Sequence, residues 1–168
     1  MDLFRSGKPD EADALFIRSR NFPEDATLSA ESHFWQGEIA IKAGSDAPAL
    51  SHYRAFLNAP GAFNSDLYNE GEYGAAYALF RQRKYRDAAV GFRKYADATT
   101  AQAPGGHRPD ALLRIGDCFY IDKDYGRAVL SYQKSLDAGT TQQQYARYQQ
   151  ARCKGLDGDL TGALDGMT

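Results

Sequence analysis

The stretch Asp110–Leu136, DALLRIGDCFYIDKDYGRAVLSYQKSL, contains two helical segments joined by a short polar turn, Asp122-Lys123-Asp124. Glycine in the middle of a helix costs about 1 kcal/mol relative to alanine. For Gly116 we therefore expect close approach of the second helix, with Ala128 opposite. Apolar and small residues recur at helical spacing in both segments: Leu112, Ile115, Gly116 and Phe119 before the turn, and Ala128, Tyr132 and Leu136 after it. This stretch predicts a pair of antiparallel helices.

The same arrangement recurs along the chain. Each unit has a small residue near the start of its second helix, and these residues are 37, 39, 40 and 35 positions apart: Ala12, Ala49, Ala88, Ala128 and Ala163. A sustained period of this kind is typical of a solenoid. We therefore predict one domain over residues 1–168, with a partial repeat at 1–24, repeats at about 26–61, 65–100 and 107–139, and a partial repeat at 140–168. In the repeat at 65–100 we expect Ser65 or Asp66 to cap the first helix, and an aromatic row along that helix formed by Tyr73, Tyr77 and Phe80.

The repeating unit resembles the tetratricopeptide repeat, a helix–turn–helix motif of about 34 residues. The resemblance rests on Leu112, Ile115, Gly116, Phe119, Tyr125, Ala128 and Tyr132. Segments Phe34–Glu38, Ile115–Tyr120 and Tyr145–Gln149 are also similar to bacterial arrays of the Bacteroidetes group, which are often exported to the periplasm or outer membrane. The resemblance implies an all-α fold, a right-handed superhelix of antiparallel helix pairs. Its first helices would line a concave groove that takes a peptide or a partner helix.

Carrying the repeat phase over to the first helices gives the candidate residues of that groove. They are Trp35, Glu38, Tyr73, Tyr77, Arg81, Arg114, Asp117, Tyr120, Tyr148 and Arg152. Aromatic and arginine side chains are favoured where binding energy concentrates, and we expect Tyr77, Arg114 and Tyr148 to be the most exposed. The alternative is that some of these side chains only pack between helices. The clamp with which some tetratricopeptide domains grip a terminal carboxylate is absent, because aromatic, leucine and acidic residues stand in its place.

The composition bounds the other classes of function. A net charge of −2 provides no long-range attraction to nucleic acid, and no apolar run is long enough to insert directly into a membrane. The N-terminal residues Met1–Arg5 lack the basic start and apolar block of a signal peptide. The compartment therefore stays unknown, and it would be the periplasm or outer membrane if a longer chain were exported. Because the chain starts and stops inside repeats, we expect a piece of a longer protein or ends covered by a partner.

Side chains with chemical reactivity do not form a convincing site. His33, His52 and His107 are far apart in the repeat plan, so we expect no catalytic residue, cofactor or metal. We expect Cys118 and Cys153 to be free, buried thiols, because equivalent places on stacked helices are too far apart for a disulfide. The basic residues Arg81, Arg83, Lys84, Arg86, Arg93 and Lys94 are expected to be a solvated turn; the alternative is contact with phosphate or an acidic partner.

The sequence therefore indicates a scaffold or adaptor for protein–protein interaction rather than an enzyme. Three alternatives stay open. The chain could be an assembly module of the cell envelope, or a recruiting segment of an enzyme whose catalytic domain lies elsewhere. It could also form a homodimer through apolar residues at the repeat ends, namely Leu3, Phe4, Leu160 and Leu164.

Overall fold

The computed structural model describes residues 9–19, 25–98 and 106–165, which form helices joined by short turns, without a strand among them. The chain divides into two compact units, Met1–Gln82 and Arg83–Thr168. The first holds α2 (Pro9–Ser19), α3 (Ala26–Lys42), α4 (Asp46–Leu57), the 3-10 turn η1 (Ala62–Asn64) and α5 (Tyr68–Arg81). The second holds α6 (Tyr85–Ala98), α7 (Arg108–Ile121), α8 (Tyr125–Asp137), α9 (Gln143–Leu156) and α10 (Leu160–Asp165).

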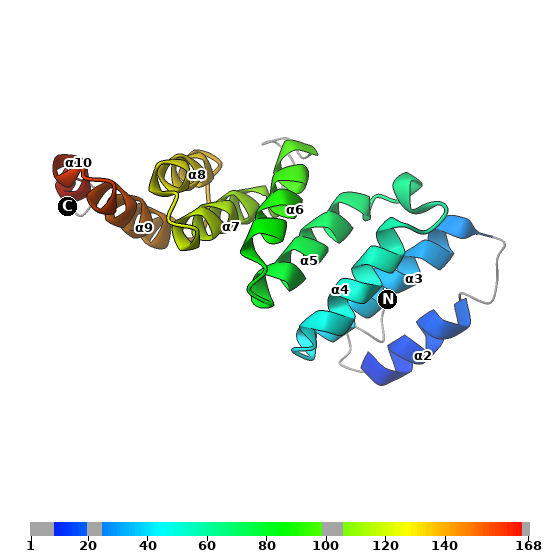
Figure 1. Ribbon diagram of the computed structural model, residues 1–168. Helices are drawn as coiled ribbons and strands as arrows, with labels where there is room; N and C mark the ends of the chain where they lie inside the picture. Colours follow the sequence, from blue (N-terminus) through cyan, green and yellow to red (C-terminus); the bar gives the residue numbers. More distant parts are fainter. Residues whose placement is uncertain (1–8, 20–24, 99–105, 166–168) are drawn as a thin grey trace. The chain divides into compact units, whose positions relative to one another are not determined.

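Within each unit, every helix packs against the next one along the chain. Figure 1 shows α3 beside α4 in the first unit and α7 beside α8 in the second. This arrangement confirms the predicted fold class, an all-α solenoid of antiparallel helix pairs. The boundaries of the repeats and the assignment of one domain stay predictions.

One turn geometry recurs directly after α3, α5, α7 and α9. The residue in the left-handed region has a φ between 61° and 94°, and it is Gly44, Arg83, Lys123 or Gly158. These positions are 39, 40 and 35 residues apart, the same intervals that separate the small residues of the second helices. A positive φ is uncommon in residues other than glycine, and Arg83 and Lys123 adopt it at the same place in their repeats as Gly44 and Gly158.

Close contacts between paired helices depend on glycine. A Cβ atom at Gly116 would lie 2.7 Å from the ring of Tyr132, and one at Gly37 would lie 2.7 Å from the ring of Tyr53. The close approach predicted at Gly116 is confirmed, but the nearest atoms belong to the Tyr132 ring and not to Ala128. A tyrosine of the second helix thus occupies the space that the missing side chain leaves.

The interior of the second unit is built around that tyrosine. Leu113, Ala128, Tyr132, Ala146 and Cys153 form one buried cluster drawn from α7, α8 and α9. Both cysteines are free and buried, as predicted. Burial raises the pKa of Cys118 to about 12 and that of Cys153 to about 11, so both thiols stay protonated at neutral pH.

Two local predictions were wrong. We expected Ser65 or Asp66 to cap α5, but the helix begins at Tyr68 after Leu67. The hydroxyl of Ser65 instead donates to Glu31 Oε1 at 2.6 Å and accepts from the Leu67 backbone N–H at 3.1 Å. These bonds hold residues 65–67 in a turn after the 3-10 helix, so α5 begins later than the sequence pattern indicated.

The second correction concerns the histidines, which were expected to lie far apart. The rings of His33 on α3 and His52 on α4 stack, with 6.5 Å between their centroids. Antiparallel pairing brings these positions together because each histidine stands near the middle of its helix. The close pairing gives His33 and His52 a packing role between the two helices.

Candidate functional site

In each unit, the first helices of the repeats carry the predicted partner-binding residues. In the first unit, α3 and α5 form a surface that we call the first-helix face of the first unit. In the second unit, α7 and α9 form the corresponding surface, the first-helix face of the second unit.

An aromatic row marks the first-helix face of the first unit. Tyr73, Tyr77 and Phe80 follow one another along α5, with ring centroids 5.9 Å and then 6.5 Å apart. All three are half-buried. The predicted row is therefore present, although Tyr77 is less exposed than we expected.

The other candidates of this unit have partners inside it. Glu38 accepts a hydrogen bond from the Tyr53 hydroxyl at 2.7 Å. Arg81 pairs with Asp46 at 2.9 Å, and Trp35 packs edge-on against Phe34 with ring centroids 5.1 Å apart. Glu38 and Arg81 thus help to fix α3, α4 and α5 together, whereas the contact of Trp35 with Phe34 lies within α3.

In the second unit, the carboxylate of Asp117 links three helices. Asp117 is 5% exposed. Its Oδ1 accepts from the hydroxyl of Tyr132 on α8 at 2.9 Å and from that of Tyr145 on α9 at 2.8 Å. Its Oδ2 accepts from Arg114 Nη1 on α7 at 2.9 Å. One side chain therefore satisfies donors from α7, α8 and α9.

Arg114 was expected among the most exposed groove residues, and this expectation was wrong. Its side chain is 17% exposed and pairs with Asp110 at 3.2 Å as well as with Asp117. Residues three and four apart on a helix are neighbours, so one guanidinium reaches both carboxylates. These ion pairs hold the Arg114 side chain against the surface of α7, so the side chain does not extend into solvent.

Burial dominates the titration of this network. The pKa of Asp117 is raised because its carboxyl is removed from water, and the bonds from Tyr145, Tyr132 and Arg114 only partly oppose that rise. Burial and the neighbouring Asp117 raise the pKa of Tyr145 to about 12. Both tyrosine hydroxyls therefore remain protonated donors at neutral pH, and the network holds its geometry.

Outward from Asp117, aromatic side chains line the first-helix face. Tyr145 and Tyr148 are exposed, the latter by 54%. The Arg152 guanidinium lies 4.9 Å from the centroid of the Tyr120 ring. Because Tyr145, Tyr148 and Arg152 are three and four residues apart on α9, they share one side of that helix. Tyr145 was not among the predicted groove residues, because periodicity along α9 does not show that its hydroxyl reaches Asp117 on α7.

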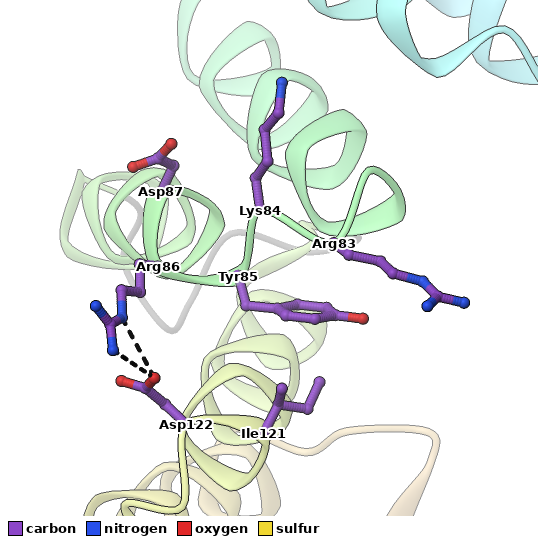
Figure 2. Close-up of a pocket in the computed structure, with 7 residues that line it drawn as sticks. All are labelled: Arg83, Lys84, Tyr85, Arg86, Asp87, Ile121 and Asp122. Atoms are coloured by element: carbon purple, nitrogen blue, oxygen red, sulfur yellow. Dashed lines mark hydrogen bonds and ion pairs between the residues drawn. The ribbon is translucent and has the colours of Figure 1, made fainter.

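The basic run of the sequence does not form one continuous surface. Arg86 pairs with Asp122 at 2.9 Å, and Figure 2 shows the side chains of Arg83 and Lys84 pointing away from that pair. Tyr85 and Ile121 complete the lining of the hollow between these turns. The side chains of Arg83, Lys84 and Arg86 are exposed, as expected of a solvated turn, and contact with an acidic partner stays the alternative.

Among the described residues there is neither a cluster of metal ligands nor a helix that could span a membrane. Within residues 9–19, 25–98 and 106–165, no three histidine, cysteine or acidic side chains gather as a metal site would require. Over the same part of the chain, no helix combines the length and apolar character needed to cross a bilayer. What the described residues do provide is extended helical surface.

Paired helices, a recurring turn and a repeat of 35–40 residues define the class of protein as an all-α repeat solenoid. Residues 73–142 match the tetratricopeptide repeat family. Residues 73–142 therefore consist of tetratricopeptide repeats. Proteins built from such repeats generally serve as scaffolds for protein–protein interaction.

Solved structures share this fold along almost the whole chain. MamA aligns with a TM-score of 0.79 and 14% identity over 98% of this chain and 88% of its own. The apo form of RapI aligns with a TM-score of 0.79 and 15% identity, over 99% and 64% of the two chains. BtubC from P. vanneervenii has a TM-score of 0.75 and 15% identity, over 98% and 72%. No curated protein matches the sequence significantly.

Proposed function

We propose that the first-helix face of the second unit binds an extended peptide of a partner protein. The observation that carries this proposal is the exposed pair Tyr145 and Tyr148, of which Tyr145 is bonded to the buried Asp117 carboxylate. Tyrosine provides a large, rigid contact area together with a polar hydroxyl group, and it is enriched at binding hot spots.

The network beneath the tyrosines lowers the cost of binding. The bond to Asp117 fixes the Tyr145 ring, and stacking on Tyr120 holds Arg152. A surface whose side chains are already ordered loses little conformational entropy when a partner arrives. The function is therefore recognition by a preformed surface, without bond chemistry.

Site-specific photo-crosslinking tests this proposal. A benzophenone amino acid would replace Tyr148 in the full chain, expressed in the organism that encodes it, and crosslinked proteins would be identified by mass spectrometry. The matched control carries the same amino acid in place of Gln133, which is exposed on the second helix α8. We expect a partner crosslinked at position 148 and not at 133. Equal crosslinking at both positions, or none at 148, would overturn the proposal.

Self-association is a second candidate function, favoured by apolar exposure at α10. Leu164 is 68% exposed there, and Leu156 is exposed at the end of α9. Leu3, Phe4 and the side chain of Leu160, which we also predicted at this interface, lie outside the described residues. The solution mass across a concentration series tests it. A dimer that Leu164→Glu dissociates supports self-association, and a mass of 18.5 kDa at all concentrations rejects it.

A further inference from the structure

A second surface of the second unit lies on the side of its second helices. There, α6 and α8 flank α7 and leave a hollow of about 310 Å³. Its floor is apolar, because Leu112, Ile115 and Phe119 of α7 line it. Leu112 and Ile115 are buried, whereas the Phe119 ring is half-buried and reaches the hollow's surface. The hollow is thus open to an apolar side chain from outside.

Cations surround the Phe119 ring. The guanidinium carbons of Arg93 on α6 and Arg127 on α8 lie 5.9 Å and 4.5 Å from its centroid. Lys134, about two helical turns after Arg127 on α8, also lines the hollow. Asp97 is the single acidic residue of the lining. Among the described residues Arg127 pairs with Asp124, but Arg93 and Lys134 have no acidic partner there.

Exposed aliphatic side chains lie beside these cations on both helices. Leu130 on α8 is 62% exposed and lines the hollow, and Val90 on α6, three residues before Arg93, is 55% exposed. Basic and apolar groups therefore alternate along both ridges. A partner matching this pattern must combine acidic and bulky apolar side chains.

The net charges of the two units also favour an acidic partner for the second unit. Residues 83–168 carry thirteen Lys and Arg against ten Asp and Glu, a net charge of +3. Residues 1–82 carry seven against twelve, a net charge of −5. The second unit attracts acidic ligands even though the whole chain, at −2, is acidic.

The hollow depends on residues that the first unit lacks. Counting from the small residue of each first helix, Ala40 stands where α7 has Phe119, and Pro48 stands where α8 has Arg127. The surface is therefore a particular feature of α6, α7 and α8, and the repeat plan alone does not produce it.

We propose that this hollow is a docking site for an acidic segment of a partner protein that carries a bulky apolar side chain. The apolar side chain lies over Phe119 against Leu130, and flanking carboxylates pair with Arg93, Arg127 and Lys134. Arginine suits this task because its planar group binds carboxylates with two parallel hydrogen bonds. The site is separate from the first-helix face, so the chain would engage two segments at once.

Fluorescence anisotropy of the full chain with labelled peptides tests the proposal. The probes are short peptides with tryptophan or leucine at the centre, flanked by aspartate and glutamate at varied spacings. Comparison peptides replace the acids by serine or the central residue by alanine. We expect saturable binding that needs both features and weakens as salt rises.

Two variants and a matched control locate the site. Arg93→Glu and Leu130→Asp should weaken binding by at least about tenfold, because the first reverses a charge facing the ligand and the second removes its apolar contact. Arg147→Glu, an exposed residue of α9 outside the hollow, changes the net charge as much as Arg93→Glu and should alter affinity by less than about twofold. Circular dichroism confirms that each variant is folded.

Nuclear magnetic resonance separates this site from the first-helix face. Backbone amide shifts on peptide addition should concentrate in α6 and α8 and leave α9 unchanged. Shifts concentrated in α9, equal weakening by Arg93→Glu and Arg147→Glu, or no binding at millimolar peptide would each overturn the proposal. A self-association that Arg93→Glu abolishes would also overturn it, because the occupant would then be a second copy of this chain.

Discussion

The helix pairs α3–α4 and α7–α8 share one packing arrangement but differ in the charged and polar groups around it. In both, a glycine of the first helix admits a tyrosine ring of the second, and the tyrosine hydroxyl donates to the acid that follows the glycine. These bonds are Tyr53 to Glu38 at 2.7 Å and Tyr132 to Asp117 at 2.9 Å. The repeat therefore includes a polar bond as well as an apolar pattern.

The two acids differ in their surroundings. Glu38 is half-buried. The shorter side chain of Asp117 stays buried, and it also receives Arg114 and Tyr145. Disrupting the Asp117 network, which joins three helices, should therefore cost more free energy than disrupting the single hydrogen bond to Glu38. The contrast teaches that one repeat motif can serve as simple packing in one unit and as the support of a surface in another.

Removing the acid should give the largest difference between the two pairs. Asp117→Ala leaves a buried hydroxyl and a largely buried guanidinium without their acceptor, and we expect a loss of about 3 kcal/mol in the free energy of unfolding. Glu38→Ala should cost only about 1 kcal/mol. Urea unfolding measures both values. Asp97→Ala, at an exposed acid, is the control and should stay within about 0.5 kcal/mol; equal losses at positions 38 and 117 would refute the contrast.

The shared glycines should give the next largest effect, and here the two pairs should agree. Gly116→Ala and Gly37→Ala each place a Cβ 2.7 Å from a tyrosine ring, so each should cost about 2 kcal/mol through overpacking. Gly126→Ala on α8 has only an Asp157 oxygen within reach, at 3.9 Å, and should be neutral or stabilise by up to about 1 kcal/mol. Thermal unfolding compares all three. A tolerated alanine at either mid-helix position would contradict the packing role.

The close helix contact at Gly116 could be predicted from the sequence, because a glycine in mid-helix is unfavourable unless a neighbouring helix packs closely against it. The sequence also indicated the helix pairs, the buried thiols and the aromatic row on α5. Arg114 and Tyr145 could not be placed in the same way. Their exposure depends on which carboxylate lies within reach across neighbouring helices, and periodicity along one helix contains no information about that. The hollow over Phe119 escaped prediction for the same reason, because it needs side chains from three helices.

Removing a single hydroxyl should give a smaller effect. Tyr132→Phe and Tyr53→Phe each delete one hydrogen bond to an acid and keep the ring, which should cost about 1 kcal/mol. The sequence offers a precedent, because Phe92 stands at the equivalent position of the repeat that has Tyr77 in place of the acid. Tyr145→Phe, at an exposed ring, should cost about 0.5 kcal/mol. Chemical unfolding measures the three losses, and a larger loss at Tyr145 than at Tyr132 would contradict the assigned burial.

The smallest expected effect is a dependence of stability on pH that distinguishes two aspartates of the second unit. Burial raises the pKa of Asp117 in the folded chain, so the folded state holds that proton more tightly than the unfolded state. Its contribution to stability is then greatest below the unfolded pKa of about 3.9 and declines as pH rises through the folded pKa. Asp117→Asn should remove this decline, and unfolding curves measured from acidic to neutral pH reveal the change of slope.

Asp124 provides the control of opposite sign. Its hydrogen bonds with Arg127 lower its pKa, so its stabilisation is present above the unfolded pKa and is lost as pH falls through the folded one. Asn can still cap α8 in its place, so Asp124→Asn should remove a loss of stability on acidification without unfolding the helix. Slopes that change in the same direction for both variants would mean that Asp117 is held ionised by Arg114 and the two tyrosines. The first-helix face would then rest on a permanent charge at neutral pH, and its affinity for basic peptides should exceed that for acidic ones.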